Sequence, residues 1–79
     1  MNNREIYDSL FVECLGVTEE ELGSDLAYQS VEMWDSVGHM QLIAALEDAF
    51  DIMLDTDDII DFSSYETGME ILKKYDVEL

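Results

Sequence analysis

The chain has 79 residues, of which 20 are acidic and three are basic, so its formal net charge at pH 7 is −17. This length favours one small domain over residues 1–79 and excludes a separate substrate domain. A hydrophobic share of 48% excludes a disordered acidic tail, while the charge excludes nucleic acid and anionic membranes as partners and favours proteins with basic surfaces.

The first segment, residues 3–15, predicts a helix. Its apolar side chains recur at spacings of three and four, which places them on one face: Ile6, Leu10, Phe11, Cys14 and Leu15. Gly16 suits the position after the last helical residue. Thr18 and the glutamates that follow it predict a capping box and one turn at residues 18–22. Cys14 is the one cysteine, so we expect a buried core thiol and neither an internal disulfide nor a cysteine metal site.

Residues 23–35 show no period, and we expect Leu26 and Val31 to hold this loop against the core. The helical pattern returns over residues 36–50, where a broad apolar stripe is formed by Leu42, Ile43, Leu46, Ala49 and Phe50. Ser36 stands at the start of this segment, and we expect it to be the N-cap residue with an exposed hydroxyl. The positive end of the helix dipole makes that position suitable for a phosphate diester.

Two further helices are predicted. Residues 55–58 begin a short one that includes Ile59, Ile60 and Phe62, and Ser63 or Ser64 caps the last one. The apolar side of the last helix consists of Met69, Ile71, Leu72 and Tyr75. No strand pattern, membrane-length apolar run or signal peptide is present. We therefore expect a cytoplasmic all-α bundle of three main helices plus one short helix, with a long loop between the first two.

A hydrolase triad of Ser36, His39 and Asp35 is one possible chemistry. The strand–turn–helix elbow and the glycine-supported oxyanion loop that such enzymes need are missing. We therefore expect no catalytic residue, and we expect His39 to be a solvated surface residue.

Metal binding is a second possibility, because residues 55–58 resemble the start of a calcium loop. Ile60 stands where that loop requires glycine. We expect no dedicated metal site, and at most loose ion binding by Asp57, Asp58 and Asp61.

Asp35, Ser36 and Val37, placed directly before an amphipathic helix, form a motif that resembles the acyl carrier protein family, and the resemblance covers nearly the whole chain. In that family the serine receives 4′-phosphopantetheine from coenzyme A, so the resemblance implies that Ser36 is the attachment residue of a phosphoprotein. It implies a phosphopantetheinyl transferase with Mg²⁺ as a partner, with Asp35 helping to position the metal or coenzyme A. The carrier would hold thioesters in fatty acid or polyketide biosynthesis.

A docking face is expected on the predicted helix 36–50. The side chains that point away from its apolar stripe are Val37, Met40, Ala44, Glu47 and Asp48. Exposed apolar groups flanked by carboxylates would let a monomeric carrier meet several loading and processing enzymes with basic patches.

Departures from the family pattern favour a free-standing, specialised carrier over the housekeeping one. Val37 replaces the usual leucine, and Gly38, His39 and Gln41 stand where fatty-acid carriers have more acids. A tryptophan before the Asp-Ser pair, here Trp34, resembles the pattern of stand-alone carriers of specialised pathways and of aminoacyl or peptidyl carriers. An aminoacyl or peptidyl carrier therefore stays open as an alternative, as does an unmodified acidic helical interaction module.

A cargo cavity between the second and third helices is also expected. Its candidate lining residues are Leu46, Leu54, Ile59 and Phe62. The bulky pair Ile59 and Ile60 could instead fill this space, which would favour short cargo.

Overall fold

The computed structural model describes residues 2–79. Their elements are α1 (Asn3–Leu15), the 3-10 turn η1 (Glu19–Glu21), α2 (Ser36–Phe50), α3 (Thr56–Asp61) and α4 (Tyr65–Lys73). Within residues 2–79, the one β feature is an isolated bridge between Ala27 and Ser64. The all-α prediction is confirmed, and so are the predicted helices at 3–15 and 36–50.

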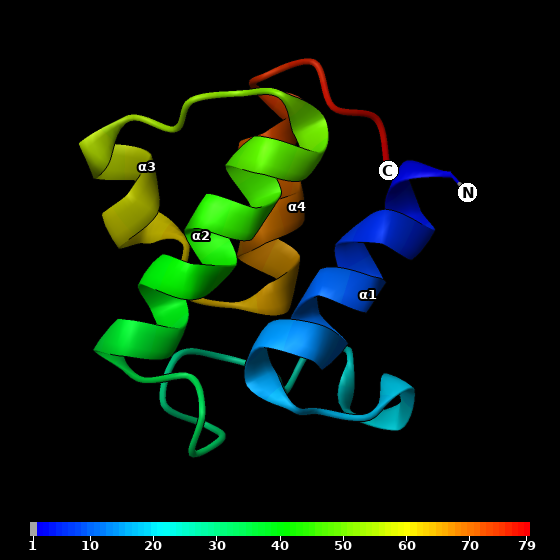
Figure 1. Ribbon diagram of the computed structural model, residues 1–79, viewed down its shortest axis with the longest axis vertical. Coiled ribbons are helices and arrows are strands. Elements are labelled where there is room, and N and C mark those ends of the chain that lie inside the picture. Colours follow the sequence, from blue (N-terminus) through cyan, green and yellow to red (C-terminus); the bar gives the residue numbers. More distant parts are fainter. Residues whose placement is uncertain (1) are drawn as a thin grey trace.

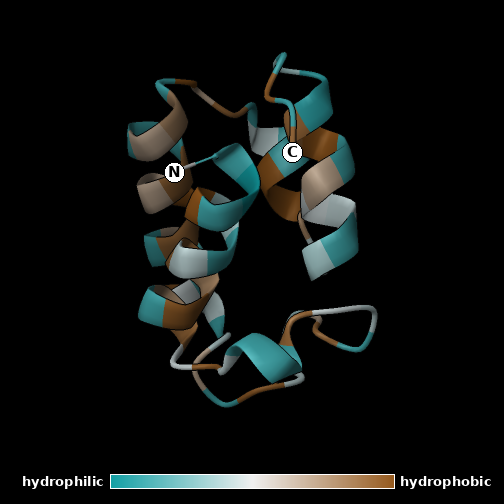
Figure 2. Ribbon diagram, turned by 90° about the vertical axis from the view of Figure 1, so that its right-hand side faces the viewer, coloured by the Kyte–Doolittle hydropathy of each residue, from teal (hydrophilic) through white to brown (hydrophobic). Residues whose placement is uncertain are grey.

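The three longer helices form the body of the bundle. Helix α1 runs in the opposite direction to α2 and α4, and the short α3 lies on the outer side of α2 (Figure 1). The long loop of residues 16–35 crosses the end of the bundle where α1 ends and α2 begins. Figure 2 shows apolar residues on the helix faces that meet and polar residues on the outer faces. No helix among residues 2–79 is long and apolar enough to cross a membrane.

Aromatic rings form the centre of the core. The Phe11 ring centroid lies 4.8 Å from that of Tyr7, 5.5 Å from that of Trp34 and 5.2 Å from that of Tyr65. Tyr7 is fully buried, and its hydroxyl donates to the Tyr65 carbonyl at 2.6 Å. This bond allows a polar aromatic residue to occupy the core, because its hydroxyl is not left unpaired.

The face of α1 that is buried in the core differs in part from the apolar face that the sequence predicted. The buried residues of α1 are Tyr7, Phe11 and Leu15, which follow one another at a spacing of four residues. Ile6, Leu10 and Cys14 are only partly buried at the edge of the core. The expected buried thiol is thus half-buried, and the pKa of Cys14 is raised, first by burial and then by the charge of Glu13.

The long loop is anchored more deeply than predicted. Leu26 is buried and Val31 packs against the core, as expected, but Trp34 is the deepest anchor, with 0% of its surface exposed. Backbone bonds also fasten the loop to the α3–α4 connection. The Tyr28 N–H donates to the Ser63 carbonyl at 2.8 Å, and the Tyr65 N–H donates to the Leu26 carbonyl at 2.9 Å.

Three of the helix ends follow the predicted signals. Gly16 closes α1 with a φ of 66°, a left-handed conformation that glycine adopts without strain. Thr18 and Glu21 form the predicted capping box at η1. Ser64 caps α4 by accepting the N–H of Thr67 at 3.0 Å. In α2, Leu42, Ile43 and Leu46 are buried as predicted, whereas Ala49 is exposed.

Candidate functional site

The start of α2 is organised by an aspartate. Asp35 is the N-cap residue, with an extended backbone, and its Oδ1 accepts the Gly38 N–H at 2.8 Å. Its carbonyl accepts the His39 N–H at 2.8 Å. The prediction that Ser36 is the cap is therefore wrong by one residue. Both residue types can cap a helix, and the choice falls on Asp35 because its backbone is the last extended one.

Ser36 is consequently the first helical residue, and its side chain is exposed. The backbone N–H groups of the first turn have no intrahelical acceptors, and only that of Gly38 is taken by the cap. The hydroxyl thus stands in solvent at the positive end of a helix of 15 residues.

Gly38 permits a close approach between the loop and the first turn of α2. It is buried, and a Cβ at this position would overlap the carbonyl oxygen of Met33. The loop that brings Trp34 into the core therefore presses directly against the helix that carries Ser36.

His39 links three segments by hydrogen bonds. The indole Nε1–H of Trp34 donates to His39 Nδ1 at 3.0 Å, and His39 Nε2 lies 2.8 Å from the Ile59 carbonyl oxygen. Because an indole N–H can only donate, Nδ1 must be the acceptor, so the neutral ring carries its proton on Nε2 and donates it to Ile59. The last carbonyls of a helix lack intrahelical donors, and His39 supplies one to α3.

This linkage overturns the expectation that His39 is a solvated surface residue, since it is half-buried and both ring nitrogens are bonded. Its hydrogen bonds leave neither nitrogen to take a proton from Ser36. Asp35 bonds the Gly38 N–H rather than the imidazole. The three residues of the hydrolase triad therefore lie near one another without forming the triad.

A groove of about 320 Å³ opens beside Ser36. It lies between α2 and α3 and is also bordered by the long loop before α2 and by the connection from α3 to α4. Most of its lining is apolar. The residues around it are Tyr28, Ser36, His39, Met40, Ile59, Ile60, Phe62 and Ser63. Of the four lining residues that the sequence predicted, Ile59 and Phe62 are present. Leu46 and Leu54 are not among the groove's residues and are instead buried in the core.

Tyr28 and Ser63 also line the groove, and the sequence did not predict that they would. Tyr28 lies in a segment without periodicity and reaches the groove through its backbone bond to Ser63, a contact between residues far apart in the chain. Ile60 lines the groove together with Ile59, and the sequence had indicated this pair at the expected cavity. Ile60 is 72% exposed.

Most of the side chains assigned to the predicted docking face are exposed. Val37 is 64% and Met40 55% exposed, and Ala44 and Asp48 are exposed beside them. Glu47 differs, because it is half-buried and its Oε2 accepts the Leu54 N–H at 2.9 Å. It holds the connection after α2 and does not stand free on the face.

The acidic segment at α3 also differs from expectation. Asp57 and Asp61 are exposed, but Asp58 is buried, and its carboxylate accepts hydrogen bonds from Lys74 and Tyr75. Asp58 thus fastens α3 to the end of α4 and is not available as an ion ligand. Over residues 2–79, no group of three or more potential ligand side chains is arranged to hold a metal ion.

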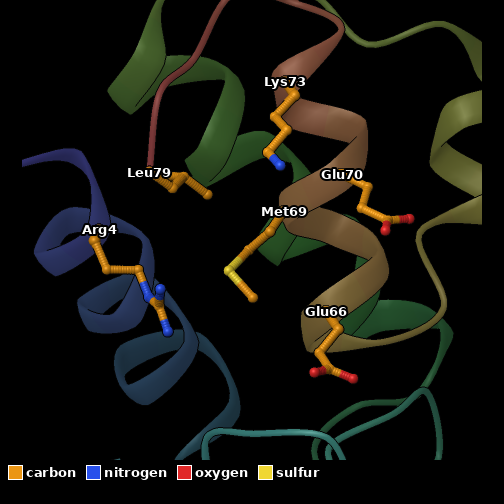
Figure 3. Close-up of a pocket in the computed structure, with 6 residues that line it drawn as sticks. All are labelled: Arg4, Glu66, Met69, Glu70, Lys73 and Leu79. Carbon is orange, nitrogen blue, oxygen red and sulfur yellow. The ribbon is translucent and has the colours of Figure 1, made fainter.

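A second pocket, of about 410 Å³, lies between α1 and α4 (Figure 3). It contains two of the three basic residues, Arg4 and Lys73, together with Glu66, Glu70, Met69 and Leu79. It shares no residue with the groove at Ser36. This pocket is therefore distinct from the apolar groove at the start of α2, both in its position and in its mixture of charged residues.

A comparison with models of protein families identifies the family of this chain. The family model described as a phosphopantetheine attachment site matches residues 9–67, from α1 to the first turn of α4. A comparison with curated protein sequences finds no significant match. Domains of this family bear a covalent 4′-phosphopantetheine, typically serve as non-catalytic carriers and generally interact with phosphopantetheinyl transferases and partner enzymes. The chain therefore belongs to the phosphopantetheine attachment site family and folds as an acyl-carrier-like helical bundle.

Proposed function

We propose that Ser36 bears the 4′-phosphopantetheine and that the protein presents acyl groups to partner enzymes as thioesters on this arm. The observation that supports this most directly is the exposed hydroxyl of Ser36 on the first residue of α2. A phosphodiester formed there keeps one negative charge, which the unpaired N–H groups and the helix dipole stabilise.

The residues around Ser36 divide the remaining tasks. Asp35 fixes the first turn of α2 and, in our proposal, also helps to position Mg²⁺ or coenzyme A during attachment. When bound, the arm supplies the thiol that forms the thioester. The chain itself serves as a carrier, without a catalytic residue of its own.

The lining of the groove favours acyl over aminoacyl cargo. Its walls beside Ser36 are formed largely by Met40, Ile59, Ile60 and Phe62. An aminoacyl group carries a charged amine, which would lose water against these walls without gaining a partner. An apolar chain gains from the same contact.

Partner enzymes are proposed to dock on the exposed face of α2, through Val37, Met40 and Ala44, with Asp48 beside them. A net charge of −17 steers the protein towards basic surfaces. Glu47 contributes its charge to this field, although its carboxylate is bonded to the backbone of Leu54. We propose that the protein works as a monomer in the cytoplasm.

Intact-mass spectrometry tests the attachment residue. The protein is incubated with coenzyme A, Mg²⁺ and a promiscuous phosphopantetheinyl transferase. We expect the mass of one phosphopantetheine on the wild type and none on Ser36→Ala. Ser63→Ala is the matched control, because Ser63 is an exposed serine on the same groove but does not begin a helix. It should be modified like the wild type.

Two outcomes would overturn the proposal. An unchanged wild-type mass would favour the unmodified acidic interaction module, and addition to Ser36→Ala would place the arm on another residue.

A further inference from the structure

We propose that His39 limits the length of the acyl chain that this protein can shelter, because it ties α2 to α3 and confines the cargo to the outer groove beside Ser36. This inference rests on the proposed function, since it concerns a chain carried on Ser36. It makes His39 a positioning residue that determines specificity.

His39 is three residues after Ser36, on the side of α2 that faces α3, and both residues line the groove. A chain that left the groove for the bundle interior between α2 and α3 would have to pass the bond from His39 Nε2 to the Ile59 carbonyl, which is 2.8 Å long.

Trp34 is 0% exposed, and the partner of its indole N–H is His39. If His39 moved aside, the indole donor and the Ile59 carbonyl would both lose a partner. An unpaired indole donor on the fully buried Trp34 is costly, so the linkage resists displacement by an apolar chain.

Phe62, which forms part of the groove wall, is 0% exposed, and Leu42 and Leu46 on the neighbouring turns of α2 are equally buried. Close-packed side chains leave no room for a guest without rearrangement.

The size of the groove then defines the cargo. About 320 Å³ lies at the low end of the roughly 300–1,000 Å³ typical of small-molecule sites. Its outer wall, with Met40 and Ile60, is open to solvent. The structure therefore fits short acyl groups, while the end of a long chain would remain in water.

Acyl forms of different length test this inference. Ser36 is loaded from acetyl-, butanoyl- and octanoyl-coenzyme A by the transferase, and Tm is measured for each form and for the protein with the unacylated arm. In the wild type we expect the gain in Tm to level off between butanoyl and octanoyl. In His39→Ala, the octanoyl form should exceed the butanoyl form by about 5 °C or more, because the chain can now bury further methylenes.

Tyr75→Phe is the control variant. It removes the hydroxyl that bonds Asp58 on α3, and neither Tyr75 nor Asp58 lines the groove. It should lower every Tm while keeping the wild-type dependence on chain length. A Tyr75→Phe profile like that of His39→Ala would show that any loosening of α3 is sufficient and would overturn the role of His39.

A second measurement needs no variant and holds even if His39→Ala fails to fold. The indole N–H of Trp34, the one tryptophan, gives a single NMR resonance that reports the bond to His39. We expect the same position and the same slow hydrogen exchange with butanoyl and octanoyl cargo. A shift or faster exchange with octanoyl alone would place the chain in the core and refute the inference. Failure of the attachment itself is visible beforehand, because no mass would be added.

Discussion

The carboxylate of Asp35 accepts the N–H of Gly38 at 2.8 Å, and this bond sets the first turn of the helix that presents Ser36. Because Asp35 caps the helix, the Ser36 side chain is not needed as the capping group. The residue that caps the helix and the residue that we propose to be modified are therefore neighbours with separate roles.

Separate roles predict that two substitutions of Asp35 will differ. Asp35→Ala removes the cap and should lower the free energy of unfolding by about 1 kcal/mol. Asp35→Asn retains a side-chain oxygen that can accept the same N–H, so its stability should remain close to that of the wild type. Urea unfolding measures both changes. A loss equal to that of Asp35→Ala in the asparagine variant would contradict the assignment of the cap.

Asp35→Asn also distinguishes the role of Asp35 as the helix cap from any role of its negative charge in attachment of the arm. If the Asp35 carboxylate helps to position Mg²⁺ or coenzyme A, Asp35→Asn should be modified more slowly by the transferase despite its intact fold. An unchanged initial rate would remove that role and leave the cap alone.

Gly38→Ala should destabilise the protein, although alanine is favoured over glycine in a helix by about 1 kcal/mol. The added Cβ overlaps the backbone carbonyl of Met33, which cannot move without displacing Trp34. Overpacking of this kind costs about 1–3 kcal/mol, so we expect a net loss measurable by thermal unfolding. Gly23→Ala is the control, since its Cβ meets nothing within 4 Å. It should be neutral or slightly stabilising.

The contact of Asp58 with Lys74 and Tyr75 predicts a component of acid sensitivity. The hydrogen bond from Lys74, followed by that from Tyr75, lowers the pKa of Asp58 in the folded state. Its stabilising effect is therefore complete above the ordinary aspartate pKa of about 3.9 and is lost as the pH falls through the lower folded-state pKa. Asp58→Asn should flatten this part of the curve of Tm against pH.

Protonation of other acidic residues also relieves the repulsion within the chain at acid pH. A second variant is therefore needed as a control for the loss of one negative charge. Asp57→Asn, at an exposed neighbouring position, removes one charge without breaking the link from α3 to α4. It should follow the wild-type slope at acid pH. Equal slopes for the wild type and Asp58→Asn would refute the linkage.

Salt should stabilise the fold. The molecule measures 29 × 28 × 20 Å, and at about 0.01 M salt the Debye length is about 30 Å, so most of its charges repel one another. At 0.15 M the Debye length shrinks to about 8 Å. We expect Tm to rise by several degrees over this range, with a larger effect of divalent cations. A Tm that is constant or falls with salt would contradict a fold limited by self-repulsion.

Local patterns in the sequence predicted the helices well, because a helix is fixed by residues three and four apart. The bounds at 3–15 and 36–50, the left-handed Gly16 and the capping box of Thr18 all depend on such short spacings. The position of the cap at α2 was missed by one residue, since Asp35 and Ser36 carry equally suitable side chains and only the backbone conformation distinguishes them.

The sequence alone therefore determined the four helices, the acidic character and the exposed serine at the start of α2. Only the tertiary structure decided that Tyr7 and Trp34 lie in the core and that His39 joins α2 to α3. It also decided that His39 and Ile59, which are joined by that bond, line the groove beside Ser36. The physical reason is distance along the chain. The partner of His39 is 20 residues away, and periodicity within one helix carries no information about which carbonyl of another helix will face it.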